Sequence, residues 1–148
     1  MKTVKEVMRK NIPMVSPNDS LKKIAKLMKD NNVWGLPVVE GGHIKGIITD
    51  GDMLNAFYIN VSTYSYEENL ESEGENHQFR KRLDEFRETK VNDVMTVHPR
   101  TVSEKTGVDE VAGILKRFKI KRLIVVDDRG NPTGLVERLD IVNSILSE

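Results

Sequence analysis

The stretch VKEVM, residues 4–8, recurs as VNDVM at residues 91–95, and this repetition is the main sequence evidence for the fold. Further residues align between the two copies: Val15-Ser16 with Val102-Ser103, Ala25 with Ala112, Leu36, Val38 and Val39 with Leu123, Val125 and Val126, and, after one extra residue in the second copy, Gly46 with Gly134 and Asp52 with Asp140. Self-similarity at a fixed spacing indicates internal duplication. The chain is therefore predicted to consist of two copies of one structural unit.

Each copy carries the patterns of the same secondary structures in the same order. In the first copy these are a helical turn at VKEVM, a brief strand around Met14-Val15, a helix over residues 19–31, strands GLPVVE and IKGIIT joined by a Gly41-Gly42 turn, and a helix from Asp50 or Gly51. In the second copy they are a helix over residues 107–118, strands RLIVVD and TGLVE around a DDRGN turn, and a helix from Arg138 towards the end. The predicted unit is β-α-β-β-α.

The length of the chain, 148 residues, favours two units that share a core. A unit of roughly 55 residues buries only about 60% of the surface of its unfolded chain, too little for two independent beads. We therefore predict an α/β fold of the α+β type, with two units packed sheet to sheet about a pseudo-twofold axis and a cleft between them. The predicted boundaries are residues 1–58 and 90–148 for the units and 59–89 for an insert.

Composition excludes several classes of protein. Lys plus Arg and Asp plus Glu both number 23, so no net charge attracts nucleic acid or an anionic membrane. The absence of cysteine excludes disulfides, thiolate nucleophiles and cysteine-based zinc sites. The charged amino terminus is not a signal peptide, and no stretch approaches the roughly 18 apolar residues of a membrane span. We therefore expect a soluble, cytoplasmic protein.

The ordered motifs carry a family resemblance. V-x-x-V-M, then V-S, an amphipathic helix, L-P-V-V-E and G-I-I-T-D-G-D resemble a CBS domain, the module named after cystathionine β-synthase, and two in tandem resemble a Bateman module. The resemblance covers about residues 3–56 and 90–147. It implies a regulatory module, without catalysis or a cofactor, that binds AMP, ADP, ATP or S-adenosylmethionine between the two copies. The regulated protein is unknown.

In this family the G-h-h-[ST]-x-x-D stretch, where h is apolar, contacts the ribose and phosphates of the ligand. The matching positions of the first copy are Gly46, Ile47, Thr49 and Asp52. Elementary chemistry agrees, because a carboxylate in a first helical turn can accept hydrogen bonds from both ribose hydroxyls, and a helix N-terminus favours phosphate. The alternative is that Thr49 or Asp50 only caps the helix and Asp52 only interacts with the helix dipole. We assign Asp50 as a cap.

The second copy departs from the motif. Glu137 stands in place of Thr49, where its carboxylate would repel a phosphate. Asp140 keeps the ribose position, and Arg138 can reach back to a phosphate. We therefore expect unequal sites, a stronger first site around Thr49 and Asp52 and a weaker second site around Glu137 and Asp140. The alternative for Glu137 is a solvated strand end.

The resemblance also implies that residues just before the L-P-V-V strand of one copy line the site of the other. Lys121 and Arg122 would then contact phosphates at the first site, with a solvated face as the alternative. Trp34 and Gly35 would line the second site, where Trp34 stacks on the base. The alternative for Trp34 is packing on a helix or at a dimer interface. The family's first strands also contact the base, which here points to Met14, Val15, Thr101 and Val102.

The insert divides into a polar, acidic part, VSTYSYEENLESEGEN, and an amphipathic part, HQFRKRLDEFRETK. Phe79, Leu83 and Phe86 share one face of a predicted helix in the second part. We expect this face to dock on the module itself, with a partner or a dimer contact as the alternative. The sequence RKR at residues 80–82 is too short and too balanced by acids to indicate nucleic-acid binding. A homodimer formed through helices is expected.

Two other functions remain open. Asp50, Asp52, Glu137 and Asp140 are candidate ligands of a divalent cation, because magnesium prefers carboxylate oxygens. The second is a ligand-free module for dimerisation or docking. An enzyme is not expected, because His43, His77 and His98 are scattered and no nucleophile, phosphate-loop or dinucleotide motif is present.

Overall fold

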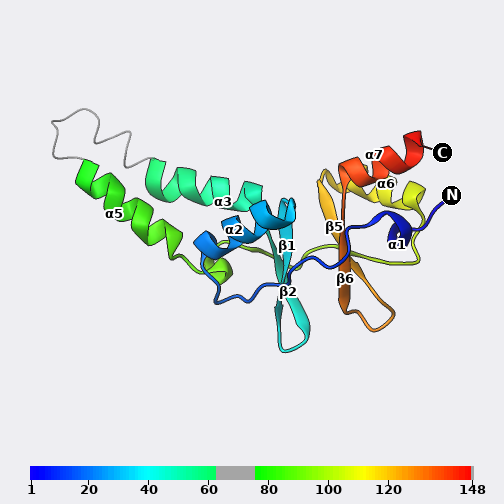
Figure 1. The fold of residues 1–148 in the computed structure, drawn as a ribbon, viewed down its shortest axis with the longest axis horizontal. Coiled ribbons are helices and arrows are strands. Elements are labelled where there is room, and N and C mark those ends of the chain that lie inside the picture. The colour runs from blue at the N-terminus through cyan, green and yellow to red at the C-terminus, as the bar shows by residue number, and fades with distance from the viewer. Residues whose placement is uncertain (63–75, 148) are drawn as a thin grey trace.

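The computed structural model describes residues 1–62 and 76–147 and forms two three-stranded sheets, one for each copy (Figure 1). The first copy contains α2 (Leu21–Asn31), β1 (Gly35–Glu40), β2 (His43–Thr49) and α3 (Asp50–Phe57). The second contains β4 (Thr101–Ser103), α6 (Val108–Phe118), β5 (Arg122–Val126), β6 (Pro132–Glu137) and α7 (Arg138–Leu146). The leading segments contain α1 (Val4–Val7) in the first copy, and η3 (Val91–Asp93) and β3 (Thr96–Val97) in the second. The predicted α+β fold is confirmed.

The first helix of each copy forms where the apolar pattern has helical spacing. On α2, Leu21, Ile24 and Met28 are buried and face the sheet. The helix begins after Ser20, whose side chain accepts a hydrogen bond from the Lys23 N–H. It ends at Asn32, a left-handed residue with φ of 51°. The prediction began two residues too early because it did not identify Ser20 as the cap.

The hairpins explain the register of both sheets. Gly41 and Gly42 both have positive φ, 58° and 78°, as a two-residue hairpin turn requires. This turn aligns β1 antiparallel to β2, and β5 is likewise antiparallel to β6. The predicted strand around Met14-Val15 is reduced to one parallel bridge from Val15 to Val38. Prolines on both sides, Pro13 and Pro17, lack the N–H that would extend the pairing.

The leading segments, which contain α1 in the first copy and η3 and β3 in the second, are exchanged: each packs on the other copy. Val4 is fully buried in the core of the second copy, whereas Val91 is fully buried in the core of the first. Strand β3 pairs with β2 of the first copy, and Arg9 forms an antiparallel bridge to Leu135 of the second. Each sheet is therefore completed by a segment that precedes the other copy in the chain.

The two sheets pack against each other, as the sequence predicted. One hydrophobic cluster joins Leu36 and Ile48 of the first sheet to Ile124 and Leu135 of the second, all fully buried. Figure 1 shows the two hairpins side by side, with the helices outside them. This arrangement brings the starts of α3 and α7 towards each other from the two copies.

The insert adds a helical arm to the first copy. Helix α3 continues into a π-helical turn, η1 (Tyr58–Ser62), and α5 (Asn76–Arg87) returns beside it (Figure 1). The rings of Phe57 and Phe86 meet edge to face with centroids 5.7 Å apart, and Phe86 also packs on the first core. The predicted amphipathic helix thus docks on its own module. Most of the polar stretch before it lies outside the described residues.

No helix within residues 1–62 and 76–147 combines the length and hydropathy needed to cross a membrane.

Candidate functional site

The two copies meet at Gly35 and Arg122, which occupy equivalent positions in the repeat. A Cβ atom on Gly35 would lie only 2.6 Å from Cδ of Arg122 and 3.6 Å from Cγ2 of Thr49. Glycine fits here because the Arg122 side chain passes through the space that a Cβ atom would fill. The crossing brings a cation of the second copy to the start of α3 in the first.

At the first site, Thr49 and Asp52 cap the start of α3 reciprocally. The Thr49 hydroxyl accepts from the Asp52 N–H at 3.1 Å, and Asp52 Oδ2 accepts from the Thr49 N–H at 3.0 Å. Asp52 Oδ1 also accepts from the Thr96 hydroxyl at 3.0 Å. A carboxylate offers about four lone-pair positions, so Asp52 keeps acceptor capacity for a ligand.

The prediction that Asp50 caps α3 is wrong. Thr49 has an extended backbone, with φ of −121°, and is the N-cap residue, whereas Asp50 is already the first residue of α3. Asp50 instead accepts a hydrogen bond from the Gly51 N–H at 2.8 Å and lies 3.7 Å from Nη1 of Arg122.

At the second site, Glu137 takes the N-cap position of α7 and is only 8% exposed. Its own N–H donates to Asp140 Oδ2 at 2.9 Å. Its Oε1 lies 3.4 Å from Nε of Arg122 and accepts from the Trp34 N–H at 3.4 Å. The interpretation of Glu137 as a solvated strand end is therefore wrong. Because Arg122 balances its charge, Glu137 repels a phosphate less than the sequence alone predicts.

Arg122 lies between the starts of α3 and α7. Its side chain is only 10% exposed and approaches Asp50 from one copy and Glu137 from the other. A solvated face is therefore excluded for Arg122, whereas the neighbouring Lys121 is exposed. Within each copy the main chain forms an equivalent hydrogen bond, because the Asp50 N–H donates to the Trp34 carbonyl in the first copy and the Arg138 N–H donates to the Lys121 carbonyl in the second.

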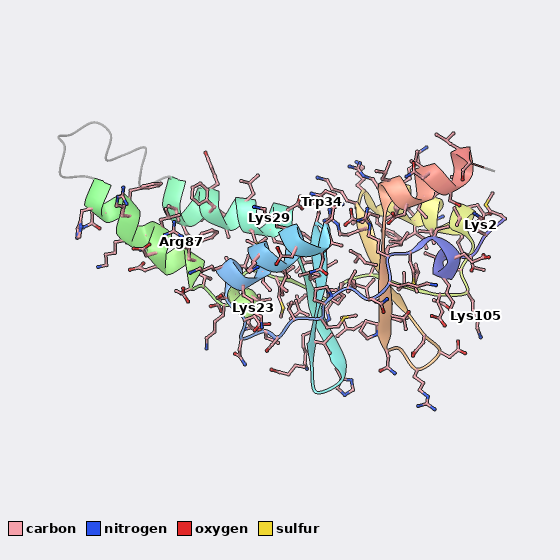
Figure 2. The ribbon with its side chains drawn as sticks, in the orientation of Figure 1. Lys2, Lys23, Lys29, Trp34, Arg87 and Lys105 are labelled. Carbon is pink, nitrogen blue, oxygen red and sulfur yellow. The ribbon has the colours of Figure 1, made fainter. Side chains whose placement is uncertain are left out.

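A cavity of about 500 Å³ opens beside the start of α7. Its lining combines the first-copy residue Trp34 with Lys121, Arg122, Glu137, Arg138, Leu139 and Val142 of the second copy. Trp34 is 42% exposed, at the end of the first sheet that faces the second copy (Figure 2). Trp34 of the first copy and Arg138 of the second therefore line the same cavity.

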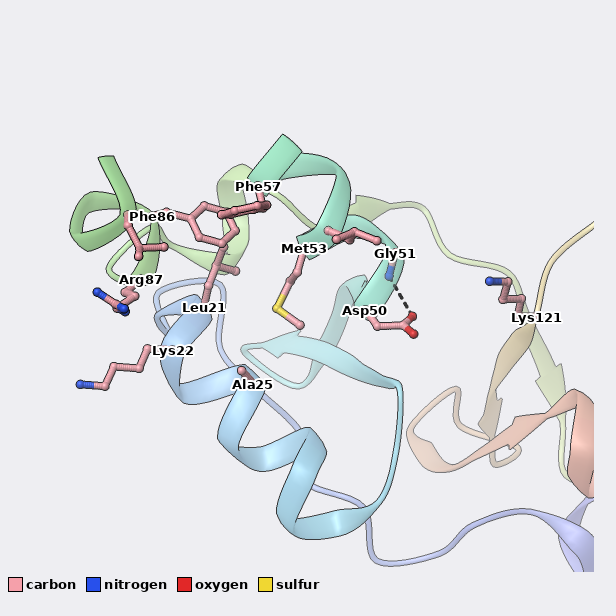
Figure 3. A pocket seen from close by; sticks show the side chains of 12 residues that line it. Leu21, Lys22, Ala25, Asp50, Gly51, Met53, Phe57, Phe86, Arg87 and Lys121 are labelled. Carbon is pink, nitrogen blue, oxygen red and sulfur yellow. Dashed lines mark hydrogen bonds between the residues drawn. The ribbon is translucent and has the colours of Figure 1, made fainter. Parts of the chain in front are cut away.

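A second cavity, of about 610 Å³, lies between α2, α3 and α5. Figure 3 shows Asp50, Gly51 and Lys121 at one end of this cavity and Phe57 and Phe86 at the other. Lys121 thus reaches across from the second copy to the start of α3. The remaining lining is mainly apolar and comes from the helices of the first copy and the insert.

Several residues predicted to contact the ligand belong to the core instead. Val15, Val102 and Ile47 are buried at 3%, 6% and 8% exposure. Met14 and Thr101, which precede the two buried valines, are exposed at the surface. Alternation along the chain explains this difference, because successive side chains of an extended segment point to opposite faces.

Comparison with known proteins agrees with this geometry. The family model described as CBS domain matches residues 4–59 and 91–147. The chain belongs to the CBS domain family. It is a tandem CBS pair, with one domain for each copy of the repeat.

Relatives align along almost the whole CBS pair. It is 30% identical over 149 residues to the CBS domain-containing protein YhcV of Bacillus subtilis, covering 100% of this chain and 89% of that protein. It is 28% identical over 157 residues to the uncharacterized protein MJ1426 of Methanocaldococcus jannaschii, covering 97% and 90%.

Two similar solved structures contain adenosine derivatives. CBSX2 in complex with AMP has 25% identity and a TM-score of 0.72, with 99% of this chain and 98% of that chain covered. The CBS domain pair of protein MJ0100, in complex with 5'-methylthioadenosine and S-adenosyl-L-methionine, has 25% identity and a TM-score of 0.70, covering 97% and 99%.

The acidic residues that the structure describes are not grouped as metal ligands. Within residues 1–62 and 76–147, no three carboxylate or histidine side chains are grouped so that they could hold a metal ion. Asp50 and Glu137 are turned towards Arg122, and Asp140 lies 3.5 Å from Nε of Arg9. Two arginines, Arg122 and Arg9, therefore lie beside these carboxylates.

Two residues at the site were missed from the sequence, Thr96 and Arg9. They are equivalent, because each directly follows a V-x-x-V-M segment. Thr96 bonds to Asp52, and Arg9 pairs with Asp140, so the equivalence extends to their contacts. The signal was present in the repeat, but only the exchange of the leading segments brings these positions to the two carboxylates.

Proposed function

We propose that this CBS pair is a regulatory module that binds AMP, ADP, ATP or S-adenosylmethionine between its two domains. The observation that carries the proposal is the approach of the second-domain cations Lys121 and Arg122 to the start of α3, where Thr49 and Asp52 form a capping box. A carboxylate, a helix start and cations in one place suit a ribose joined to a phosphate. The complexes of CBSX2 and MJ0100 support the choice of an adenosine-containing ligand.

Each residue of the first site has a distinct role in this proposal. Asp52 accepts hydrogen bonds from the ribose hydroxyls, for which it keeps free lone pairs beside its bonds to Thr49 and Thr96. The Thr49 hydroxyl and the start of α3 bind the phosphate. Arg122 and Lys121 neutralise the phosphate charge, and Arg122 exchanges its 3.7 Å contact with Asp50 for the ligand.

At the weaker second site, the corresponding residues are Asp140 for a ribose, Arg138 for a phosphate and the Trp34 ring beside Gly35 for a base. The exposed residues Met14 and Thr101 provide contacts at the edges of the bases. A ligand held by both domains regulates a target because it binds one relative orientation of the domains more tightly than another.

Isothermal calorimetry with AMP, ADP, ATP and S-adenosylmethionine tests the proposal on wild type and Asp52→Ala. We expect at least one of these ligands to bind wild type and the substitution to abolish binding at the first site. Asp128→Ala is the matched control, because Asp128 lies in the turn between β5 and β6, where it is paired with Lys105. Since Asp52 also caps α3, unfolding curves without ligand show whether each variant is folded. Unchanged affinity in folded Asp52→Ala contradicts the assigned role.

The exposed apolar residues of α3 and α7 support a homodimer, with a second copy of the chain as the occupant. Both helices lie along the same edge of the molecule (Figure 1). The exposed apolar side chains on these helices are Leu54, Leu139, Val142, Ile145 and Leu146. Apolar side chains gathered in this way mark an interaction surface.

Light scattering after size exclusion tests the dimer. We expect twice the monomer mass for wild type and the monomer mass for Leu139→Glu, which places a charge on the proposed interface. Val97→Glu, at an exposed position on β3 outside both helices, should leave the mass of the dimer unchanged. A monomeric wild type contradicts this part of the proposal.

A further inference from the structure

We propose that Arg9 blocks the second site, so that the CBS pair binds one adenosine-containing ligand rather than two. This inference rests on the proposed function and identifies the residue that makes the two sites unequal. From the sequence, the inequality is attributed to the charge of Glu137. Because Arg122 balances that charge, Arg9 is the decisive difference between the two sites.

The two sites are otherwise built alike. At both, the carboxylate of the third helical residue accepts from the N–H of the cap residue, Thr49 for Asp52 at 3.0 Å and Glu137 for Asp140 at 2.9 Å. The second contact of each carboxylate differs. Asp52 accepts from the small, neutral hydroxyl of Thr96, whereas Asp140 faces a guanidinium.

Arg9 covers both groups that a nucleoside needs at the second site. Its Nε lies 3.5 Å from Oδ2 of Asp140, the carboxylate proposed for the ribose. Its guanidinium carbon lies 5.5 Å from the centre of the Trp34 ring, the face proposed for the base. One side chain therefore stands between the acceptor and the stacking surface.

Three anchors keep Arg9 in this position. Besides the ion pair with Asp140 and the stacking on Trp34, its Nη1 donates to the Asn32 carbonyl at 2.7 Å. Its backbone N–H is also bonded to the Leu135 carbonyl, which fixes the point from which the side chain extends. At the second site, a ligand must break several contacts of the partly buried Arg9 side chain at once. At the first site, it needs only to share Asp52 with Thr96.

Arg9 can instead serve as a phosphate ligand, and the two roles predict opposite results. Its Nε is buried and makes no hydrogen bond to the described residues, because the contact to Asp140 has ion-pair distance but not hydrogen-bond geometry. If Arg9 blocks the site, its removal adds a binding event. If Arg9 binds phosphate, its removal takes one away.

Calorimetric titration with AMP, and separately with S-adenosylmethionine, measures the number of sites per chain. The variants exploit the repeat: Arg9→Thr gives the second site the residue of the first, and Thr96→Arg gives the first site the residue of the second. We expect one bound ligand for wild type, two for Arg9→Thr and none for Thr96→Arg. Asp140→Ala combined with Arg9→Thr should return the number to one. Arg9→Gln, which keeps a long side chain with an N–H donor, repeats the test if Arg9→Thr is unstable.

The outcomes separate the inference from the proposed function. Two sites in wild type, or one site in both folded Arg9 variants, overturn the blocking role while adenosyl binding stands. Fewer sites in Arg9→Thr than in wild type also overturn it and assign Arg9 to the phosphate. If neither of these ligands, nor ADP or ATP, binds wild type or any variant, the proposed function fails and the inference fails with it.

Discussion

At Gly46, a Cβ atom would lie 2.6 Å from the carbonyl oxygen of Thr96 and 2.9 Å from the sulfur of Met95. Gly134 meets Met8 and the Arg9 carbonyl in the same way. The glycine of the G-h-h-[ST]-x-x-D motif is therefore required for packing, because a leading segment crosses directly over it. The V-x-x-V-M and G-h-h motifs recur together in the chain since one packs on the other.

Replacing Gly46 by alanine should destabilise the fold by about 1–3 kcal/mol, because a backbone oxygen cannot move aside as a side-chain end can. Gly113→Ala is the control. Gly113 lies on the exposed face of α6 with nothing near its Cβ position, and alanine there should stabilise the fold by about 1 kcal/mol. Urea unfolding of the two variants measures both changes. Equal changes in the free energy of unfolding of the two variants would show that the leading segment does not pack tightly against Gly46.

Among the elements, the two hairpins show how one unit has diverged. The first turn uses two glycines, whereas the longer second turn is organised by Asp127. Asp127 Oδ1 accepts from the N–H groups of Arg129 at 2.9 Å and Asn131 at 3.0 Å, and Gly130 has φ of 81°. The hydrogen bond from the Asn131 N–H, assisted by that from Arg129, holds the pKa of Asp127 below its ordinary value.

This turn should make stability depend on pH in a defined direction. Because the pKa of Asp127 is lower in the folded state, its contribution is complete above the unfolded pKa of about 4 and is lost as pH falls through the folded pKa. Asp127→Asn keeps the Oδ1 acceptor but does not titrate, so its unfolding free energy should fall less than that of wild type below about pH 4. Urea unfolding from pH 6 to pH 2 measures the difference. A steeper acid loss in Asp127→Asn would reverse the assigned direction.

For the whole molecule, the exchange of leading segments links the cores of the two domains. Val4 completes the core around Val108 and Val111, and Val91 completes the core around Leu21 and Ile24. The packing therefore crosses the predicted boundaries at residues 58 and 90. Arg9 and Thr96 reach Asp140 and Asp52 by the same exchange, so the two cores and the surroundings of the two carboxylates depend on one topological feature.

Val4→Ala and Val91→Ala form a matched pair for this exchange. Each removes two buried methyl groups and should cost about 1–3 kcal/mol. Hydrogen exchange should show the larger loss of protection in α6 for Val4→Ala and in α2 for Val91→Ala. A loss confined to the domain that each residue precedes in sequence would contradict the exchange.

The sequence by itself determined the duplication, the order of elements, the Gly41-Gly42 hairpin and the apolar faces of α2 and α6. These features depend on residues close together in the chain, where periodicity and turn chemistry act locally. The sequence also indicated that cations before β5 reach the start of α3, because the repeat and the family resemblance place them there.

Which distant charges meet is settled only in the folded structure. Arg122 lies beside Asp50, and Arg9 faces Asp140. Both ion pairs join residues far apart in sequence, and their distances depend on how two sheets and two exchanged segments pack. Local patterns identify the charged residues, but long-range packing selects their partners.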